Sequence, residues 1–234
     1  MTRQRLVWLF NNATTSSDFQ TTILLSKDSE DHDTDRRYYP KAIGPADLHS
    51  HLTTNIDIHF VKDIARCFGR DCDVQYEEFQ PQFTTSIDFQ DNWNYRYLMD
   101  VDGAGFSGRF IPFLHSHSLV FKAGIFREWW DGRVHAWKHF VPVDIRFMEL
   151  PGLLAYFGGW ENRKMTSDSQ GMIEVLEQPH EGEAKMIAEE GREWAGKALR
   201  KEDMEIYMFR LLLEWGRLTD DRRDEIGWRD DLVI

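Results

Sequence analysis

The fold is decided by residues 95–143, whose sequence is YRYLMDVDGAGFSGRFIPFLHSHSLVFKAGIFREWWDGRVHAWKHFVPV. Residues 95–101 are apolar and aromatic, which predicts a buried strand. The glycine-rich residues 102–108 end that strand, and a helical pattern begins at their end. Residues 118–123 predict a second strand. The apolar face of the intervening helix comprises Phe110, Phe113 and Leu114.

A strand, a glycine-rich turn, a helix and a strand form the βαβ unit of a nucleotide-binding half-domain. Glycine allows the backbone to approach an anion closely, and the start of a helix offers free N–H groups. Ser107 is a good N-cap whose hydroxyl could face a phosphate instead, and the guanidinium of Arg109 suits a diphosphate. In the alternative interpretation the glycines only form a tight loop and Arg109 is an ordinary surface residue. The glycine spacing matches neither of the two common phosphate-binding fingerprints.

A set of short segments in and around this stretch carries a family resemblance. The segments are Asp102-Gly103, Ser107-Gly108-Arg109-Phe110, Ser118-Leu119-Val120-Phe121-Lys122, Phe126-Arg127-Glu128-Trp129 and Trp137-Lys138-His139-Phe140-Val141-Pro142. Together they resemble glycosyltransferase family 90. This family contains fungal capsule-associated xylosyltransferases and the animal protein O-glucosyltransferases and O-xylosyltransferases that modify EGF-like repeats. Fungal members are most similar, and the likeness is looser over residues 1–90.

The resemblance implies an α/β fold with a Rossmann-like, donor-binding half of a two-domain GT-B-type glycosyltransferase, followed by C-terminal helices. Residues 1–234 would be the C-terminal portion of the family domain. Within them, residues 1–90 would be a partial, loosely matching lead-in, and residues 91–218 the donor-nucleotide-binding core with the C-terminal helices. Because Met1 falls in what would be the middle of the family domain, we expect an N-terminally truncated gene product or a split gene model.

The function that the resemblance implies is transfer of xylose or glucose from a UDP-sugar to a glycan or protein hydroxyl. The reaction would be inverting and metal-independent, with the UDP-sugar as donor substrate and no further cofactor. Such a transfer needs a base for the acceptor hydroxyl, positive charge for the leaving diphosphate and a pocket for the nucleoside. The alternative is a catalytically inactive donor-binding fragment that acts only as a nucleotide- or partner-binding module.

Glu128 is the candidate for the ribose hydroxyls; in the alternative interpretation it is a surface charge beside two tryptophans. Arg3 is the best match to a donor-binding arginine that the family places early in a helix; in the alternative interpretation it lies on a solvated helix face. The predicted donor-binding residues are Arg3, Gly103, Ala104, Gly105, Phe106, Ser107, Gly108, Arg109 and Glu128. The catalytic base is not identified, because the family supplies an aspartate from an acceptor-side half that precedes this part. Asp100 and Asp102 lie near the turn, where Asp102 is expected to be a turn former. Three aromatic residues could line the cleft but are more typical of a core, namely Trp129, Trp130 and Trp137.

The formal net charge of −12 argues against nucleic acid as a partner, because phosphate backbones need a basic surface. The sequence shows no signal peptide and no membrane span, which by itself indicates a cytosolic protein. The resemblance implies instead the Golgi or ER lumen, with membrane attachment only through a missing N-terminal anchor. Cys67 and Cys72 would form a local disulfide in an oxidising lumen or remain free thiols in the cytosol. His49, His51 and His59 have no acidic or cysteine partner at ligand spacing, so no metal site is expected.

Outside the central stretch the elements follow from periodicity. Strands are expected at residues 21–25, 55–60 and 139–143. Helices are expected at residues 1–11, 46–50, 144–157 with an interruption near Pro151-Gly152, 183–199, and from 201 onward. Residues 158–179 are mixed and polar, with a loop expected around residues 166–171. The apolar face of the last helix is expected to pack in the core and comprises Met204, Tyr207, Met208, Leu211, Leu212 and Trp215.

Overall fold

The computed structural model describes residues 21–26, 38–58, 60–61, 68–79, 83–84, 88–165 and 171–226. Its centre is a three-stranded parallel sheet in the order β5 (Tyr97–Val101), β6 (Leu119–Ala123) and β7 (Val141–Pro142). Helix α4 (Phe110–Leu114) connects the first two strands. The mixed α/β class and the predicted strand, turn, helix and strand are therefore confirmed.

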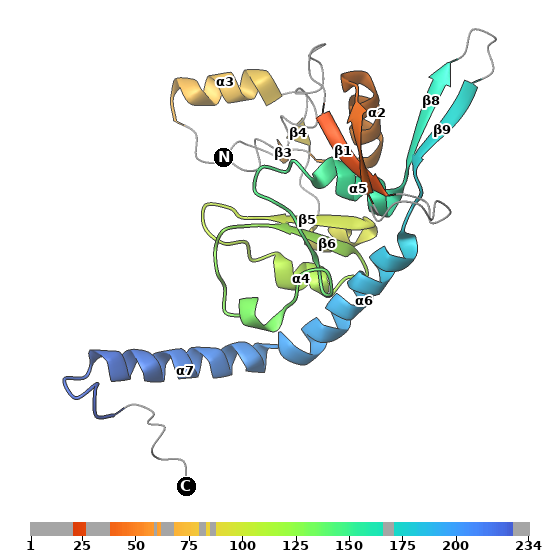
Figure 1. Ribbon diagram of the computed structural model, residues 1–234. Coiled ribbons are helices and arrows are strands. Elements are labelled where there is room, and N and C mark those ends of the chain that lie inside the picture. The colour runs from red at the N-terminus through yellow and green to blue at the C-terminus, as the bar shows by residue number, and fades with distance from the viewer. Residues whose placement is uncertain are drawn as a thin grey trace.

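The two faces of the sheet are covered by different elements, as the alternation of side chains in a strand requires. On one face, Leu119, Phe121 and Ala123 join the larger hydrophobic core. On the other face, Val120 joins a second core that also contains the predicted apolar side of α4. In Figure 1, α4 lies below the sheet and α5 (Leu150–Gly158) lies above it.

Helix α6 (Glu181–Ala198) runs past both cores and joins them. Its first half places Ala184 and Ile187 in the larger core, and its second half places Ala195 in the smaller one. Gly191 is the point of closest approach, because a Cβ there would lie 2.4 Å from the carbonyl oxygen of His139. The helix therefore fixes the segment before β7 against the rest of the domain.

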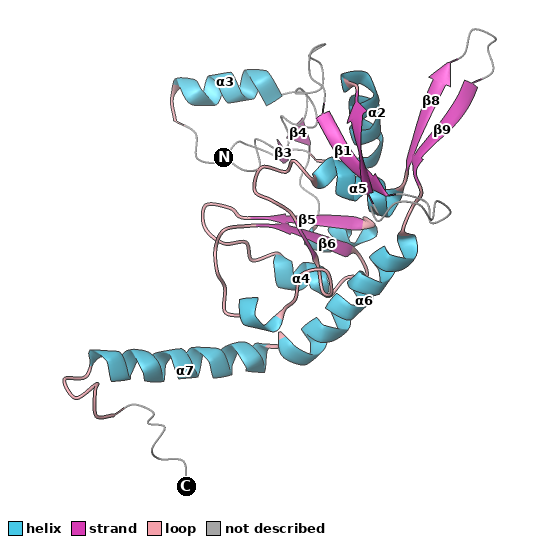
Figure 2. Ribbon diagram, in the orientation of Figure 1, coloured by secondary structure: helices cyan, strands magenta, loops and turns pink. Residues whose placement is uncertain are grey.

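Antiparallel hairpins and short helices complete the structure (Figure 2). The hairpins are β1 (Thr21–Ser26) with β2 (Tyr38–Ile43) and β8 (Trp160–Met165) with β9 (Gly171–Glu177). The short parallel pair is β3 (Phe60–Val61) with β4 (Phe83–Thr84). The remaining elements before the C-terminal helices are α2 (Pro45–Asn55), α3 (Arg70–Phe79), η3 (Phe89–Asn94) and η4 (Asp131–Arg133).

Several predicted boundaries are wrong. The helix expected at residues 144–157 begins only at Leu150, because Pro151 occupies its first turn, where a missing N–H costs nothing, rather than interrupting it. Residues 158–179, for which no strand was predicted, contain the antiparallel strands β8 and β9. The strand expected at residues 55–60 begins only at Phe60, since Asn55 still belongs to α2.

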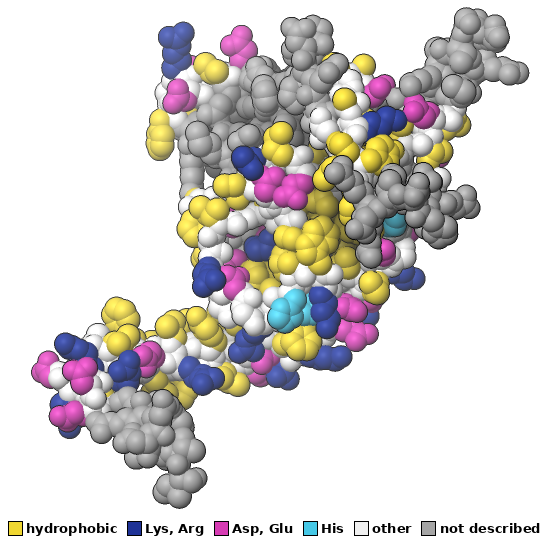
Figure 3. All heavy atoms as spheres, in the orientation of Figure 1, with side chains coloured by type: hydrophobic (Ala, Val, Ile, Leu, Met, Phe, Trp, Pro, Cys, Tyr) yellow, Lys and Arg dark blue, Asp and Glu magenta, His cyan; other side chains and the backbone are white. Residues whose placement is uncertain are grey.

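The C-terminal helix α7 (Lys201–Thr219) contradicts the expectation that its apolar face lies in a core. None of its residues is buried, and it projects away from the rest of the described chain (Figure 1). In Figure 3 hydrophobic side chains lie along its surface. Ten large hydrophobic side chains of this helix are exposed, and they are Met204, Ile206, Tyr207, Met208, Phe209, Leu211, Leu212, Leu213, Trp215 and Leu218. Amphipathic periodicity therefore predicted the helix but not its surroundings.

Candidate functional site

The candidate site lies at the carboxyl ends of β5 and β6. The two strands pair in parallel with Asp100 opposite Lys122 and Val101 opposite Ala123. Ligands of open α/β sheets bind outside the carboxyl ends of the strands. The glycine-rich turn follows β5 directly, so the structure places this turn where such a ligand would bind.

The turn itself is exposed and has an ordinary backbone. Gly103, Gly105 and Gly108 have no positive φ, and a Cβ built on any of them would meet nothing within 4 Å. The Gly103 N–H donates to the carbonyl oxygen of Gly105 at 2.9 Å. The side chains of Ala104 and Phe106 face solvent, Phe106 with 65% of its surface exposed. Glycine at these positions therefore leaves open space beside the backbone rather than permitting an unusual conformation.

Ser107 does not act as the predicted N-cap. Its buried hydroxyl donates to the carboxylate of Asp100, and the Arg109 N–H reaches the same hydroxyl oxygen at only 3.4 Å. The helix begins after Arg109 and has no side-chain cap. With only the five residues Phe110–Leu114, α4 is too short to supply a strong helix dipole.

Arg109 is held by the end of β5. One terminal nitrogen of its guanidinium donates to the carbonyl oxygen of Val101 at 2.7 Å, and Nε lies 3.7 Å from Oδ1 of Asp100. Its side chain keeps 30% of its surface exposed. The guanidinium is thus oriented by the chain and still accessible to an anion from solvent.

Asp100, Lys122 and Glu128 form a charged cluster beneath the turn. Lys122 Nζ lies 3.1 Å from Oδ2 of Asp100 and 3.9 Å from Oε1 of Glu128. The ammonium also stands 4.8 Å from the ring centre of Phe110 and 4.9 Å from that of Trp130. Aromatic faces attract cations, so these rings stabilise a charge that has largely left water.

Glu128 lies inside this cluster and not on the surface. Its Oε2 accepts a hydrogen bond from Trp130 Nε1 at 3.2 Å, and its Oε1 has no hydrogen-bond partner among the described residues. Burial raises the pKa of Glu128, while Lys122 and the indole N–H act in the opposite direction. Of the nearby tryptophans, Trp130 belongs to the core, whereas Trp137 is 54% exposed with a φ of 64°.

Comparison with known proteins defines the family. The sequence pattern of Glycosyl transferase family 90 matches residues 44–224. The chain belongs to this family. An O-glucosyltransferase rumi homolog of Anopheles gambiae is 26% identical over 213 residues, which cover 77% of this chain and 48% of that protein. An O-glucosyltransferase rumi homolog of Aedes aegypti is 29% identical over 136 residues, which cover 57% of this chain and 29% of that protein. The chain therefore spans about half the length of the relatives it matches, or less.

In this family 90 chain, Asp102 has a structural role that the sequence did not predict. Instead of forming a local turn, its Oδ2 accepts the N–H groups of Ile125 at 2.6 Å and Phe126 at 3.4 Å. A Cβ on Gly124 would lie 2.7 Å from Oδ1. Asp102 thus ties the turn after β5 to the segment after β6, and Gly124 provides the space. Only the parallel pairing of the strands brings these residues together.

Other predicted residues of the family 90 chain lie elsewhere. Arg3, Cys67 and His59 are outside the described residues. Cys72 is disulfide-bonded, so the alternative of free thiols is wrong. His51 is buried against Trp160, with ring centres 4.1 Å apart.

Within the described part of the chain, no group of three or more His, Cys, Asp or Glu side chains is placed to hold a metal ion. In the same residues no helix is long and apolar enough to cross a bilayer.

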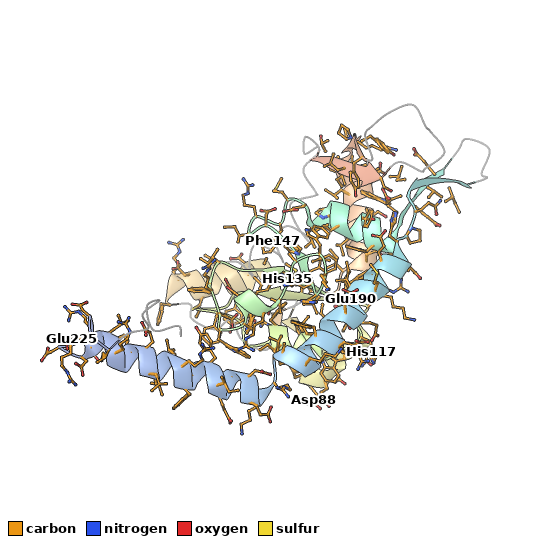
Figure 4. The ribbon with its side chains drawn as sticks, turned by 60° about the horizontal axis from the view of Figure 1, so that its bottom comes forward. Asp88, His117, His135, Phe147, Glu190 and Glu225 are labelled. Atoms are coloured by element: carbon orange, nitrogen blue, oxygen red, sulfur yellow. The ribbon has the colours of Figure 1, made fainter. Side chains whose placement is uncertain are left out.

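A shallow hollow of about 190 Å³ lies between the segment before β7 and helix α6. It is lined by Lys138, His139, Glu190, Glu193, Trp194 and Lys197. None of these was predicted to bind the donor. Figure 4 labels Glu190, one of the lining residues on α6, and His117, whose ring contacts Glu189 of the same helix. The lining mixes two cations with two carboxylates, so it offers no net charge for a diphosphate.

Proposed function

We propose that this family 90 chain binds a UDP-sugar and takes part in transferring its sugar to a hydroxyl of a glycan or protein. The observation that carries the proposal is the family match over residues 44–224, which includes the whole glycine-rich turn and both strands beside it. In this proposal residues 91–218 form the donor-nucleotide-binding core of a Rossmann-like half of a GT-B-type enzyme. The ER or Golgi lumen is the proposed compartment, consistent with the disulfide at Cys72.

The donor diphosphate is proposed to lie over residues Gly103–Gly108, with Arg109 at its edge. The open space at the three glycines admits a close approach to the backbone, and the exposed part of Arg109 supplies a charge-assisted contact. Positive charge at this point stabilises the negative charge that develops on the leaving diphosphate. As the family resemblance implies, the proposed reaction is inverting and metal-independent.

The nucleoside is proposed to lie toward Glu128, whose buried carboxylate would accept a ribose hydroxyl. Its unpartnered Oε1 supports this assignment, because a buried acceptor without a hydrogen bond is costly. For the sugar, the relatives named O-glucosyltransferases favour glucose over xylose. Arg3 stays a proposed donor contact from the sequence alone.

A second candidate function is donor binding without turnover. The observation that favours it is the state of Asp100 and Asp102, the carboxylates closest to the turn. Asp100 is fully buried and bonded to Ser107 and Lys122, and Asp102 accepts two backbone N–H groups. Neither is available as a base for an acceptor hydroxyl, and general-base catalysis typically contributes about 10²–10⁴ in rate.

The deciding experiment measures binding and turnover separately on the purified chain. We expect calorimetric titration to show binding of UDP, with weaker binding of ADP as the control nucleotide. We expect release of UDP from UDP-glucose or UDP-xylose in the presence of sugar acceptors to be near background. Robust turnover would show that a base lies within this chain, whereas no detectable binding of UDP would refute the donor-binding proposal.

A further inference from the structure

Asp100 is the most deeply buried charged residue of the candidate site. None of its surface is exposed, and it lies on β5, an outer strand of the parallel sheet, opposite Lys122 on β6. A buried carboxylate is strongly unfavourable unless cations and hydrogen-bond donors surround it. A hydrophobic residue would fit this strand position without that penalty, so the contacts of the carboxylate call for an explanation beyond packing.

The two oxygens of Asp100 serve different partners. Oδ1 accepts the hydroxyl of Ser107 and lies 3.7 Å from Nε of Arg109. Oδ2 accepts a hydrogen bond from Lys122 Nζ at 3.1 Å. One oxygen therefore faces the exit of the glycine-rich turn, and the other faces the neighbouring strand.

These contacts fix the two residues that flank Gly108. Ser107 donates a hydrogen bond to the carboxylate of Asp100. Arg109 forms an ion pair with the same carboxylate and donates a hydrogen bond to the carbonyl oxygen of Val101, the next residue of the strand. Glycines on both sides leave the turn free to adopt other conformations. The anchoring of Ser107 and Arg109 thus restricts the turn at the end where the guanidinium begins.

We propose that Asp100 is a positioning residue, which holds Arg109 and the end of the glycine-rich turn in the conformation that receives a diphosphate. Lys122 is its counter-charge inside the sheet. This inference rests on the proposed donor-binding function. It assigns Asp100 no contact with the donor, because the side chain is fully enclosed.

The first test is a double-mutant cycle on UDP affinity, measured by calorimetry with Asp100→Asn, Arg109→Ala and the double variant. Asn keeps the shape of the side chain but removes the charge that attracts Arg109 and Lys122. We expect each single variant to bind UDP roughly tenfold more weakly, in line with the loss of one charge-assisted contact. If Asp100 acts through Arg109, the double variant binds about as weakly as Arg109→Ala alone. A hundredfold additive loss would show independent action and overturn the inference.

The matched control is Asp144→Asn. Asp144 also holds neighbouring groups, since it accepts the N–H groups of Arg146 and Met148, but it lies in the loop before α5. We expect this variant to lose stability without a change in UDP affinity. An equal loss of affinity in the control and in Asp100→Asn would show that general destabilisation explains both, which also overturns the inference.

The second test needs no ligand. The Nε–H resonance of Arg109 in the free protein reports whether its guanidinium is held in place. We expect a protected, slowly exchanging signal in the wild type and a loss of protection in Asp100→Asn. Where Asp100→Asn fails to fold, Asp100→Asn/Lys122→Met removes both charges together and carries the same expectation. An unchanged signal overturns the inference.

The two tests separate the inference from the function on which it rests. If the wild type does not bind UDP, the proposed function is refuted, and the Arg109 signal still decides whether Asp100 positions the guanidinium. If the wild type binds UDP and Asp100→Asn binds it equally well, the proposed function stands and the positioning role fails.

Discussion

At the scale of single residues, the site depends on which charges the fold brings together. Asp100 and Lys122 are far apart in the chain, and they meet because β5 and β6 pair in a register that places them side by side. Arg109 then binds the end of β5 instead of extending freely into solvent. Ser107 and Arg109, which the sequence predicted as donor contacts, are therefore held in place by Asp100 and Val101, neither of which was predicted to have this role.

Arg109→Ala should weaken UDP binding about tenfold or more, because one charge-assisted contact contributes roughly 1.5–3 kcal/mol. Calorimetric titration of both proteins with UDP measures the effect. Arg96→Ala is the matched control, since Arg96 is an exposed arginine at the opposite end of β5 that pairs with Glu181. Equal UDP affinity of Arg109→Ala and the wild type would contradict the assignment.

Glu128 should make the protein less stable as the pH rises. Burial raises its pKa above the ordinary value of 4.5, so the folded chain retains a proton that the unfolded chain has lost. The free energy of unfolding therefore falls between pH 4.5 and the raised pKa. In urea titrations from pH 4 to pH 7, Glu128→Gln should lack this decrease. Glu193→Gln, at an exposed pair with Lys197, is the control and should follow the wild type.

At the scale of elements, packing partners decide what each segment does. Helix α2 is held against β8 by the stacking of His51 on Trp160, between residues more than a hundred positions apart. Asn55 Nδ2 lies 3.3 Å from Nδ1 of the imidazole, and Nε2 has no hydrogen-bond partner among the described residues. A histidine in this position is suited to its neutral form.

His51→Phe should reduce the sensitivity of the fold to acid. Burial lowers the pKa of His51 to about 4. Below pH 6.5 the unfolded chain therefore binds a proton at this histidine, while the folded chain keeps it neutral until the pH approaches 4. This group's stabilisation is complete above pH 6.5 and is lost as the pH falls toward 4. Between pH 7 and pH 5 the loss is about 2 kcal/mol, from 1.36 kcal/mol per pKa unit. Phenylalanine keeps the stacking and cannot titrate, so denaturation at both values should show a smaller difference than in the wild type. Equal differences would refute the assignment.

At the scale of the whole molecule, α7 is the feature that the rest of the described chain does not cover. A contiguous apolar surface of this kind marks an interaction site or favours association. Met204, Met208, Leu211, Trp215 and Leu218 follow one another at alternating spacings of four and three residues, the spacing of a helix–helix seam.

The isolated chain should therefore self-associate through α7 as its concentration rises. Leu211→Lys/Trp215→Lys places two charges on the seam and should shift the protein toward the monomer in light scattering coupled to gel filtration. Glu214→Lys is the matched control, because it changes the net charge by the same amount on the polar side and removes only an exposed ion pair. Association that persists in the double variant, or that Glu214→Lys abolishes equally, would contradict the prediction.

The sequence by itself determined the central βαβ unit, the helix α6 and the family resemblance that the comparison confirmed. These features depend on local periodicity and on short segments close together in the chain. Glycine, serine and arginine at residues 103–109 predicted the turn after the first strand. They did not predict the hydrogen bonds that Ser107 and Arg109 form there. The predicted start of α5 was wrong because of Pro151, since a proline within an apolar pattern can either interrupt a helix or begin one.

Only the tertiary structure decided how the candidate site is built and which helix stays exposed. The parallel register placed Lys122 on Asp100, and the joined ends of β5 and β6 placed Asp102 on the N–H groups of residues 125 and 126. The exposure of α7 likewise depends on whether another element packs against it, and the amphipathic pattern of its own sequence does not determine this. Long-range pairing has no local signal in a single sequence, because the residues that meet are selected by the packing of whole elements.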